Sequence, residues 1–74
     1  MTTFVHIPCC AENLSWVISH LLQFGHHTLR EVRWTGGEQF VLKANFATDA
    51  DCYECLRVAQ NFEKITGWTV IGGN

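Results

Sequence analysis

The chain has 74 residues, of which 47% are hydrophobic and 16% are charged, and its net charge is -2. This balance is typical of one globular domain with a thin polar coat and excludes a disordered chain. The five lysines and arginines are scattered and form no basic stripe that would neutralise phosphates, so we expect no nucleic-acid partner. A core of this size contributes only about 3 to 5 kcal/mol net, which favours a protein partner or a homodimer.

The amino terminus and the cysteines indicate the compartment. Residues 1–8 contain no basic segment followed by a long apolar stretch, so we expect neither a signal peptide nor a membrane span. Four cysteines are fewer than a disulfide scaffold of this length usually carries, and a reducing compartment keeps them as thiols. We therefore expect a cytoplasmic protein.

The first predicted elements are a strand and a helix. Residues 4–9 alternate between two faces and predict a strand that is stopped by Pro8. The inward side of this strand is Val5, Ile7 and Cys9, and the other side is Phe4 and His6. A helix then opens at Glu12-Asn13, with Asn13 as its N-cap, and ends at Gly25. Its apolar residues recur at helical spacing and predict a buried face of Leu14, Val17, Ile18, Leu21 and Phe24.

A hairpin follows, with strands over residues 28–35 and 38–46. A three-residue loop at Gly36-Gly37-Glu38 is favoured over a two-residue Gly36-Gly37 turn, because it collects the apolar side chains on one face. The pairs that result are Trp34 with Phe40 and Val32 with Leu42. Every large apolar residue of the hairpin except Leu29 and Val41 is then expected on one buried face.

The last predicted elements are a second helix and a closing strand. Thr48 or Asp49 caps the helix, and Gly67 terminates it. Its apolar stripe is Cys52, Cys55, Leu56, Ala59, Phe62 and Ile65. Residues 68–71 form the closing strand, before a flexible Gly-Gly-Asn tail.

The order strand, helix, two strands, helix, strand predicts an α+β fold in one domain over residues 1–74. We expect a ferredoxin-like βαββαβ sandwich, with a four-stranded antiparallel sheet and two helices on one face.

Cys52 and Cys55 have the spacing of zinc sites and of dithiol redox centres. Both fall on the buried stripe of the second helix, so we expect them to pack as small hydrophobic residues. The alternative is a Cys2His2 zinc site, because the predicted topology brings His26 and His27 to the same end of the molecule. Cys9-Cys10 is expected at the opposite end, which excludes a single site of all four cysteines.

Cys9 and Cys10 lie between the first strand and the first helix, where a helix N-terminus favours a thiolate ligand. In position this resembles the metal-binding loop of the heavy-metal-associated domains of copper chaperones. Those domains carry Met-x-Cys-x-x-Cys there, whereas this chain carries Ile7-Pro8-Cys9-Cys10. The resemblance implies a protein that binds a soft metal, Zn or Cu, as an alternative function.

The segment Pro8-Cys9-Cys10-Ala11-Glu12-Asn13-Leu14, a helix ending at Gly25 and then His27-Thr28-Leu29 together resemble the layout of ACT domains across most of the chain. ACT domains are small regulatory modules that dimerise and bind amino acids beside the loop after the first strand. The resemblance implies an amino-acid sensing module as a further alternative. Its ligand loop would contain Cys9, Cys10, Glu12 and Asn13.

An RNA-recognition domain shares this topology, but it stacks bases on aromatic residues of its central strands. The third strand here offers Gln39, Val41, Lys43 and Asn45 on its open side, so a protein partner is favoured. Trp16 lies off the buried face of the first helix and is a candidate interface anchor. The predicted protein-binding residues are Phe4, His6, Trp16, Arg33 and Lys43.

The sequence contains no motif that specifies a reaction. No nucleophile stands beside a base, and paired carboxylates, a phosphate loop and a His-Glu-x-x-His helix are all missing, so we expect no enzyme and no cofactor. The prediction is a small non-enzymatic protein-binding module. It would act as a regulatory subunit, or as an inhibitor that occludes a larger protein machine in the manner of phage-encoded anti-CRISPR proteins.

Overall fold

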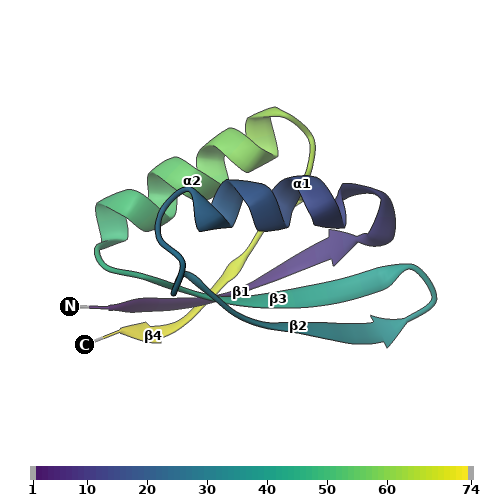
Figure 1. Cartoon of the computed structure of the whole chain (residues 1–74), viewed down its shortest axis with the longest axis horizontal. Helices are drawn as coiled ribbons and strands as arrows, with labels where there is room; N and C mark the ends of the chain where they lie inside the picture. Colours follow the sequence, from purple (N-terminus) through teal and green to yellow (C-terminus); the bar gives the residue numbers. More distant parts are fainter. Residues whose placement is uncertain (1, 74) are drawn as a thin grey trace.

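The computed structural model of the chain describes residues 2–73, which contain four strands and two helices. In chain order these are β1 (Thr3–Cys10), α1 (Ala11–Leu22), β2 (Leu29–Gly36), β3 (Gln39–Phe46), α2 (Asp49–Asn61) and β4 (Thr69–Gly73). Figure 1 follows them from purple to yellow. In this part of the chain no helix is long and apolar enough to cross a membrane.

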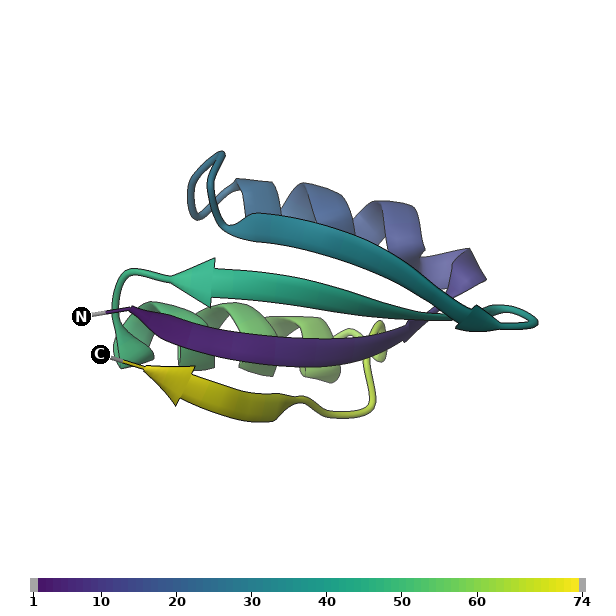
Figure 2. The same cartoon turned by 90° about the horizontal axis from the view of Figure 1, so that it is seen from below.

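The strands form one antiparallel sheet in the order β2-β3-β1-β4. Both helices cover the same face of this sheet (Figure 1), and the view from below shows the strands in front of the helices (Figure 2). The protein is therefore α+β, with a four-stranded antiparallel sheet and two helices, a layout compatible with a ferredoxin-like sandwich. One face of the sheet carries no helix.

Strand β1 confirms the predicted alternation, because Val5, Ile7 and Cys9 are buried in the core. The prediction that Pro8 stops the strand is wrong, since β1 continues to Cys10 and Pro8 lies opposite Val41 of β3. Strand β4 pairs with β1 only as far as His6. Pro8 therefore lies where β1 has an open edge, and its missing N–H breaks no ladder on that side.

Helix α1 has the predicted core residues, with Val17 and Leu21 buried, but both of its ends differ from the prediction. Cys10, in extended conformation, is the N-cap, and Asn13 lies within the first turn. The helix ends at Leu22, ahead of Gly25. Strand β1 runs directly into α1, so no polar capping residue separates the two elements.

The hairpin register is confirmed, with Trp34 opposite Phe40 and Val32 opposite Leu42. The turn needs glycine, because Gly36 and Gly37 have φ of 126° and 56°, which disfavour a side chain. The predicted burial of β2 is wrong, since Val32 is 38% exposed and Trp34 is 64% exposed. β2 is an edge strand, and α1 covers it incompletely.

Leu29 also departs from the prediction. The register of β2 shifts between Leu29 and Glu31, which places Leu29 opposite Ala44. Leu29 then packs partly buried against the core. A β-bulge adds one residue to a strand and reverses the alternation on one side of it, and the sequence pattern contained no signal for the bulge.

Helix α2 begins as predicted at Thr48, whose Oγ1 accepts a hydrogen bond from the Asp51 backbone N–H at 3.1 Å. It ends at Asn61 and not near Gly67, because Glu63 adopts the left-handed conformation with φ of 59°. Phe62 was expected in the core and is 63% exposed. The remaining stripe is buried as predicted: Cys52, Cys55, Leu56, Ala59 and Ile65.

The prediction of a flexible tail is wrong for Gly72 and Gly73. Both belong to β4, where they pair with Phe4 and Thr3 of β1. Asn74 lies outside the described residues.

Candidate protein-binding surface

The helix-free face of the sheet carries four of the five predicted binding residues. Side chains alternate along a strand, and cross-strand partners share a face. Because Val5 and Ile7 point toward the helices, Phe4 and His6 of β1 lie on the other face. Their partners on β3 include Lys43, opposite His6, and Arg33 of β2 lies opposite Val41 on the same side.

A shallow hollow of about 560 Å³ lies on this face. Its apolar lining includes Phe4 and Ile71, and its polar lining includes His6, Arg30 and Lys43. Phe4 and Ile71 are both exposed, so the hollow combines accessible apolar surface with cationic groups. This surface can take an apolar side chain flanked by acidic groups.

Arg30 lines this hollow, although the sequence pattern did not place it on the helix-free face. Strict alternation from Arg33 places Arg30 on the helix side of β2. The bulge after Leu29 changes that parity and lets Arg30 line the hollow with Phe4. No residue pattern in the sequence marks this bulge.

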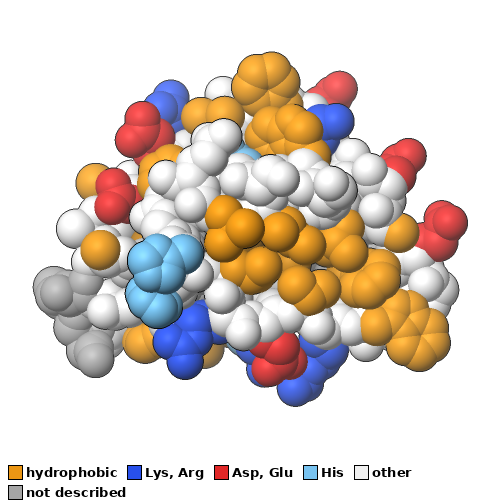
Figure 3. Space-filling view, viewed as in Figure 1, with side chains coloured by type: hydrophobic (Ala, Val, Ile, Leu, Met, Phe, Trp, Pro, Cys, Tyr) orange, Lys and Arg blue, Asp and Glu red, His pale blue; other side chains and the backbone are white. Residues whose placement is uncertain are grey.

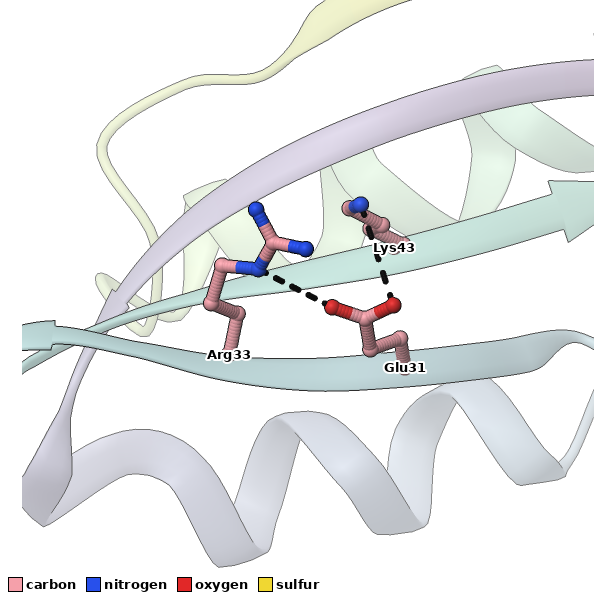
Figure 4. A network of polar contacts seen from close by, with 3 residues as sticks. All are labelled: Glu31, Arg33 and Lys43. Atoms are coloured by element: carbon pink, nitrogen blue, oxygen red, sulfur yellow. Dashed lines mark hydrogen bonds and ion pairs between the residues drawn. The ribbon is translucent and has the colours of Figure 1, made fainter.

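The hollow has a cationic surrounding. Glu31 bridges two cations, with its Oε2 3.0 Å from Arg33 Nε and its Oε1 3.7 Å from Lys43 Nζ (Figure 4). Across the four strands, Arg30, Arg33 and Lys43 outnumber Glu31, a net charge of +2. The helices carry the opposite sign, with four acidic residues and one basic residue, a net charge of -3. The helix-free face is therefore the more positive side of the sandwich.

Trp16, the fifth predicted binding residue, lies in the helix layer and not on this face. Its ring is partly buried, with centroids 4.9 Å from His20 and 5.8 Å from Phe62. Lys64 Nζ lies 5.8 Å from the ring centroid. Trp16 thus packs where the two helices meet, and the structure separates it from Phe4, His6, Arg33 and Lys43.

Cys52 and Cys55 have the environment of packing residues, at 1% and 0% exposed. Burial raises the pKa of Cys52 to about 11, with a smaller contribution from Asp49. Burial also raises the pKa of Cys55 to about 12, with smaller contributions from Cys52 and Asp51. A metal ligand or nucleophile needs the thiolate, which these values disfavour at neutral pH.

His26 and His27 are exposed, and their rings lie against each other at a tilted angle of 51°, with centroids 4.1 Å apart. Within residues 2–73, no three His, Cys, Asp or Glu side chains form a group that could hold a metal ion. The structure therefore does not assemble the Cys2His2 alternative from these histidines with Cys52 and Cys55.

The junction of β1 and α1 contains the alternative ligand residues, with Cys9 and Cys10 at the end of the strand and Glu12 and Asn13 in the first turn of the helix. Cys9 is buried, and burial raises its pKa to about 11, with a smaller contribution from Cys10. Cys10 is partly exposed, its thiol lies 3.7 Å from Glu12 Oε1, and Asn13 Nδ2 donates to its Sγ at 3.4 Å. A hollow of about 160 Å³ lies beside Cys9, Cys10 and Asn13.

No protein-family model matches this sequence, and comparisons with curated proteins and with solved structures found no match either.

Proposed function

We propose that this chain is a small, non-enzymatic, cytoplasmic protein-binding module of ferredoxin-like fold. Its helix-free sheet face binds an acidic segment of another protein. In this role it acts either as a regulatory subunit or as an inhibitor that covers a working surface of a larger protein machine.

The observation that carries this proposal is the hollow between Phe4 and Ile71, with Lys43 and Arg30 beside it. Interfaces commonly place a buried aromatic or aliphatic anchor at the centre and charged groups at the rim. Phe4 and Ile71 supply the apolar part, and the net charge of +2 on the strands favours an acidic partner.

A protein partner is favoured over single-stranded nucleic acid by the residues of β3. Base stacking needs aromatic rings on the central strands. The helix-free side of β3 presents Val41, Lys43 and Asn45, which offer no ring. Within residues 2–73, the rings that the central strands present on this face, Phe4 and His6, both belong to β1, so no stacking platform spans β1 and β3.

Affinity capture from the native host with matched variants tests the proposal. We expect Phe4→Ala and Lys43→Glu to weaken binding of the captured partner at least about tenfold, because they remove the anchor and reverse the rim charge. Arg57→Glu is the control, since Arg57 is an exposed cation of α2 on the opposite layer. A partner that binds all three variants like wild type would refute this assignment.

Amino-acid sensing is the second candidate function, favoured by the hollow of about 160 Å³ beside Cys9, Cys10 and Asn13. A ligand present at one hundred times its dissociation constant stabilises the folded state by about 2.7 kcal/mol. Thermal unfolding in the presence of each amino acid, and of Zn(II) or Cu(I) for the soft-metal alternative, separates these functions from protein binding.

A further inference from the structure

An apolar patch lies on the other side of the sheet, at its β2 edge. Figure 3 shows hydrophobic side chains gathered continuously between α1 and β2. Val32 and Trp34 lie on the helix side of β2 by their register and are still 38% and 64% exposed. Leu22 of α1 is also exposed. A contiguous exposed apolar patch of this kind marks an interaction site.

Trp34 is held in place on this patch. Its Nε1–H donates to the carbonyl oxygen of Gly37 at 2.8 Å, across the turn that follows β2. The indole is therefore oriented before any partner arrives, and binding costs little side-chain entropy. Ordered aromatic residues of this kind are frequent anchors of interfaces.

The patch adjoins an unpaired strand edge. Among residues 2–73, β2 is the outer strand of the sheet beyond β3, so one side of its eight residues has no neighbouring strand. Such an edge is a template for antiparallel pairing with another chain. One additional strand would pair with the free backbone groups of this edge, and a helix packed on that strand would cover the apolar patch.

The charges along β2 are complementary to themselves. Two copies of Glu31-Val32-Arg33 paired antiparallel, with a two-fold axis at Val32, place Glu31 opposite the partner's Arg33 and Arg33 opposite the partner's Glu31. Both residues point to the helix-free side, where they already contact each other at 3.0 Å within the chain (Figure 4). In that contact Arg33 uses only Nε, so its two terminal nitrogens are left to meet a second carboxylate.

We propose that this protein forms a two-fold homodimer in which the β2 strands of two copies pair antiparallel around Val32. The sheets join into one, and Val32 and Trp34 of both copies lie between the two α1 helices. This interface does not depend on the proposed binding of an acidic partner. It also explains why two large apolar side chains remain exposed in the single chain.

A charge-swap experiment tests the pairing. Glu31→Lys places two cations opposite each other at both ends of the Val32 pair, and Arg33→Glu places two anions there. We expect each variant alone to raise the dimer dissociation constant about tenfold or more, as like charges opposite each other destabilise strand pairs. An equimolar mixture of the two variants restores both opposite-charge pairs and forms a one-to-one heterodimer.

Sedimentation equilibrium over a range of concentrations gives the readout, and far-ultraviolet circular dichroism confirms that each variant is folded. Val32→Lys and Val70→Lys form a matched pair, since both valines are exposed on edge strands of the same sheet. We expect Val32→Lys to abolish the dimer and Val70→Lys to leave it intact. A wild-type chain that stays monomeric at millimolar concentration would overturn the proposal. So would a dimer that both Glu31→Lys and Arg33→Glu leave unchanged, or one that only Val70→Lys disrupts.

Discussion

Substitution of Cys55 distinguishes core packing from chemistry at the Cys-x-x-Cys pair. Cys55 is 0% exposed. Truncation to alanine removes one sulfur, with a transfer cost of about 0.8 kcal/mol, and leaves a hole of roughly 20 Å³ that costs about 0.5 kcal/mol more. The better helix propensity of alanine offsets about 0.5 kcal/mol. The net expectation for Cys55→Ala is a loss of about 0.8 kcal/mol in the free energy of unfolding.

Cys55→Ser tests polarity where Cys55→Ala tests volume. Serine is closer to cysteine in shape than alanine is, but it buries a hydroxyl. Burial of a hydroxyl in an apolar site costs about 1 to 3 kcal/mol. A hydrogen bond from the serine hydroxyl to the backbone carbonyl one turn earlier brings this cost toward the lower value. Serine should therefore be worse than alanine at this position.

The assay is urea unfolding under reducing conditions, followed by circular dichroism. Cys10→Ala is the control, since Cys10 is only partly buried and its side chain makes no capping hydrogen bond to α1, so stability should change by no more than about 0.5 kcal/mol. The packing interpretation fails if Cys55→Ser is as stable as wild type. It also fails if zinc stabilises wild type and not Cys55→Ser.

Two further predictions concern stability. Thr48→Ala should cost about 1 kcal/mol in urea unfolding, because it removes the acceptor of the Asp51 N–H, whereas Thr48→Ser should retain most of it. Alkaline pH should destabilise the fold, because burial raises the pKa of the thiols of Cys9, Cys52 and Cys55 from 9.0 to about 11 or 12. As the pH rises, these thiols therefore ionise in the unfolded chain before they ionise in the folded chain. The free energy of unfolding then stays level below pH 9 and falls as the pH rises toward 11 to 12. Urea titrations across this pH range measure the effect. The prediction is contradicted if the free energy of unfolding of wild type stays level, or if it falls equally in a variant with all three thiols replaced by alanine.

The hairpin pairing and the inward residues of β1 could be predicted from the sequence, because both depend only on parity, the alternation of successive side chains between the two faces of a strand. Val5, Ile7 and Cys9 have a period of two, and any sheet with one covered face buries such a set together. The same argument gave the hairpin register, since a three-residue loop fixes which residue of β2 faces Phe40. Parity is local information and needs no knowledge of the other elements.

The alternation of side chains could not predict how exposed Val32 and Trp34 of β2 are. Parity assigns Val32 and Trp34 to the helix side, but their burial depends on whether a helix extends over the edge strand. That extent is set by the packing of α1 against α2 and by helix ends that the sequence placed incorrectly. The bulge that brings Leu29 inward and Arg30 to the hollow is likewise a tertiary adjustment.

The two proposed surfaces can operate together. A two-fold axis perpendicular to the sheet keeps each helix-free face on the same side. The hollow at Phe4 and Lys43 lies mainly over β1 and β3 and reaches β2 at Arg30, outside the paired segment Glu31-Val32-Arg33. The dimer would therefore present two cationic hollows in one plane, with the acidic helices on the reverse. A partner with two acidic segments would engage both, and the second contact would form at the effective concentration set by the first. A single acidic segment would gain nothing from the dimer. Loss of the β2 pairing should then weaken binding to a divalent partner and leave binding to one segment unchanged, which separates the contribution of the dimer from that of the hollow.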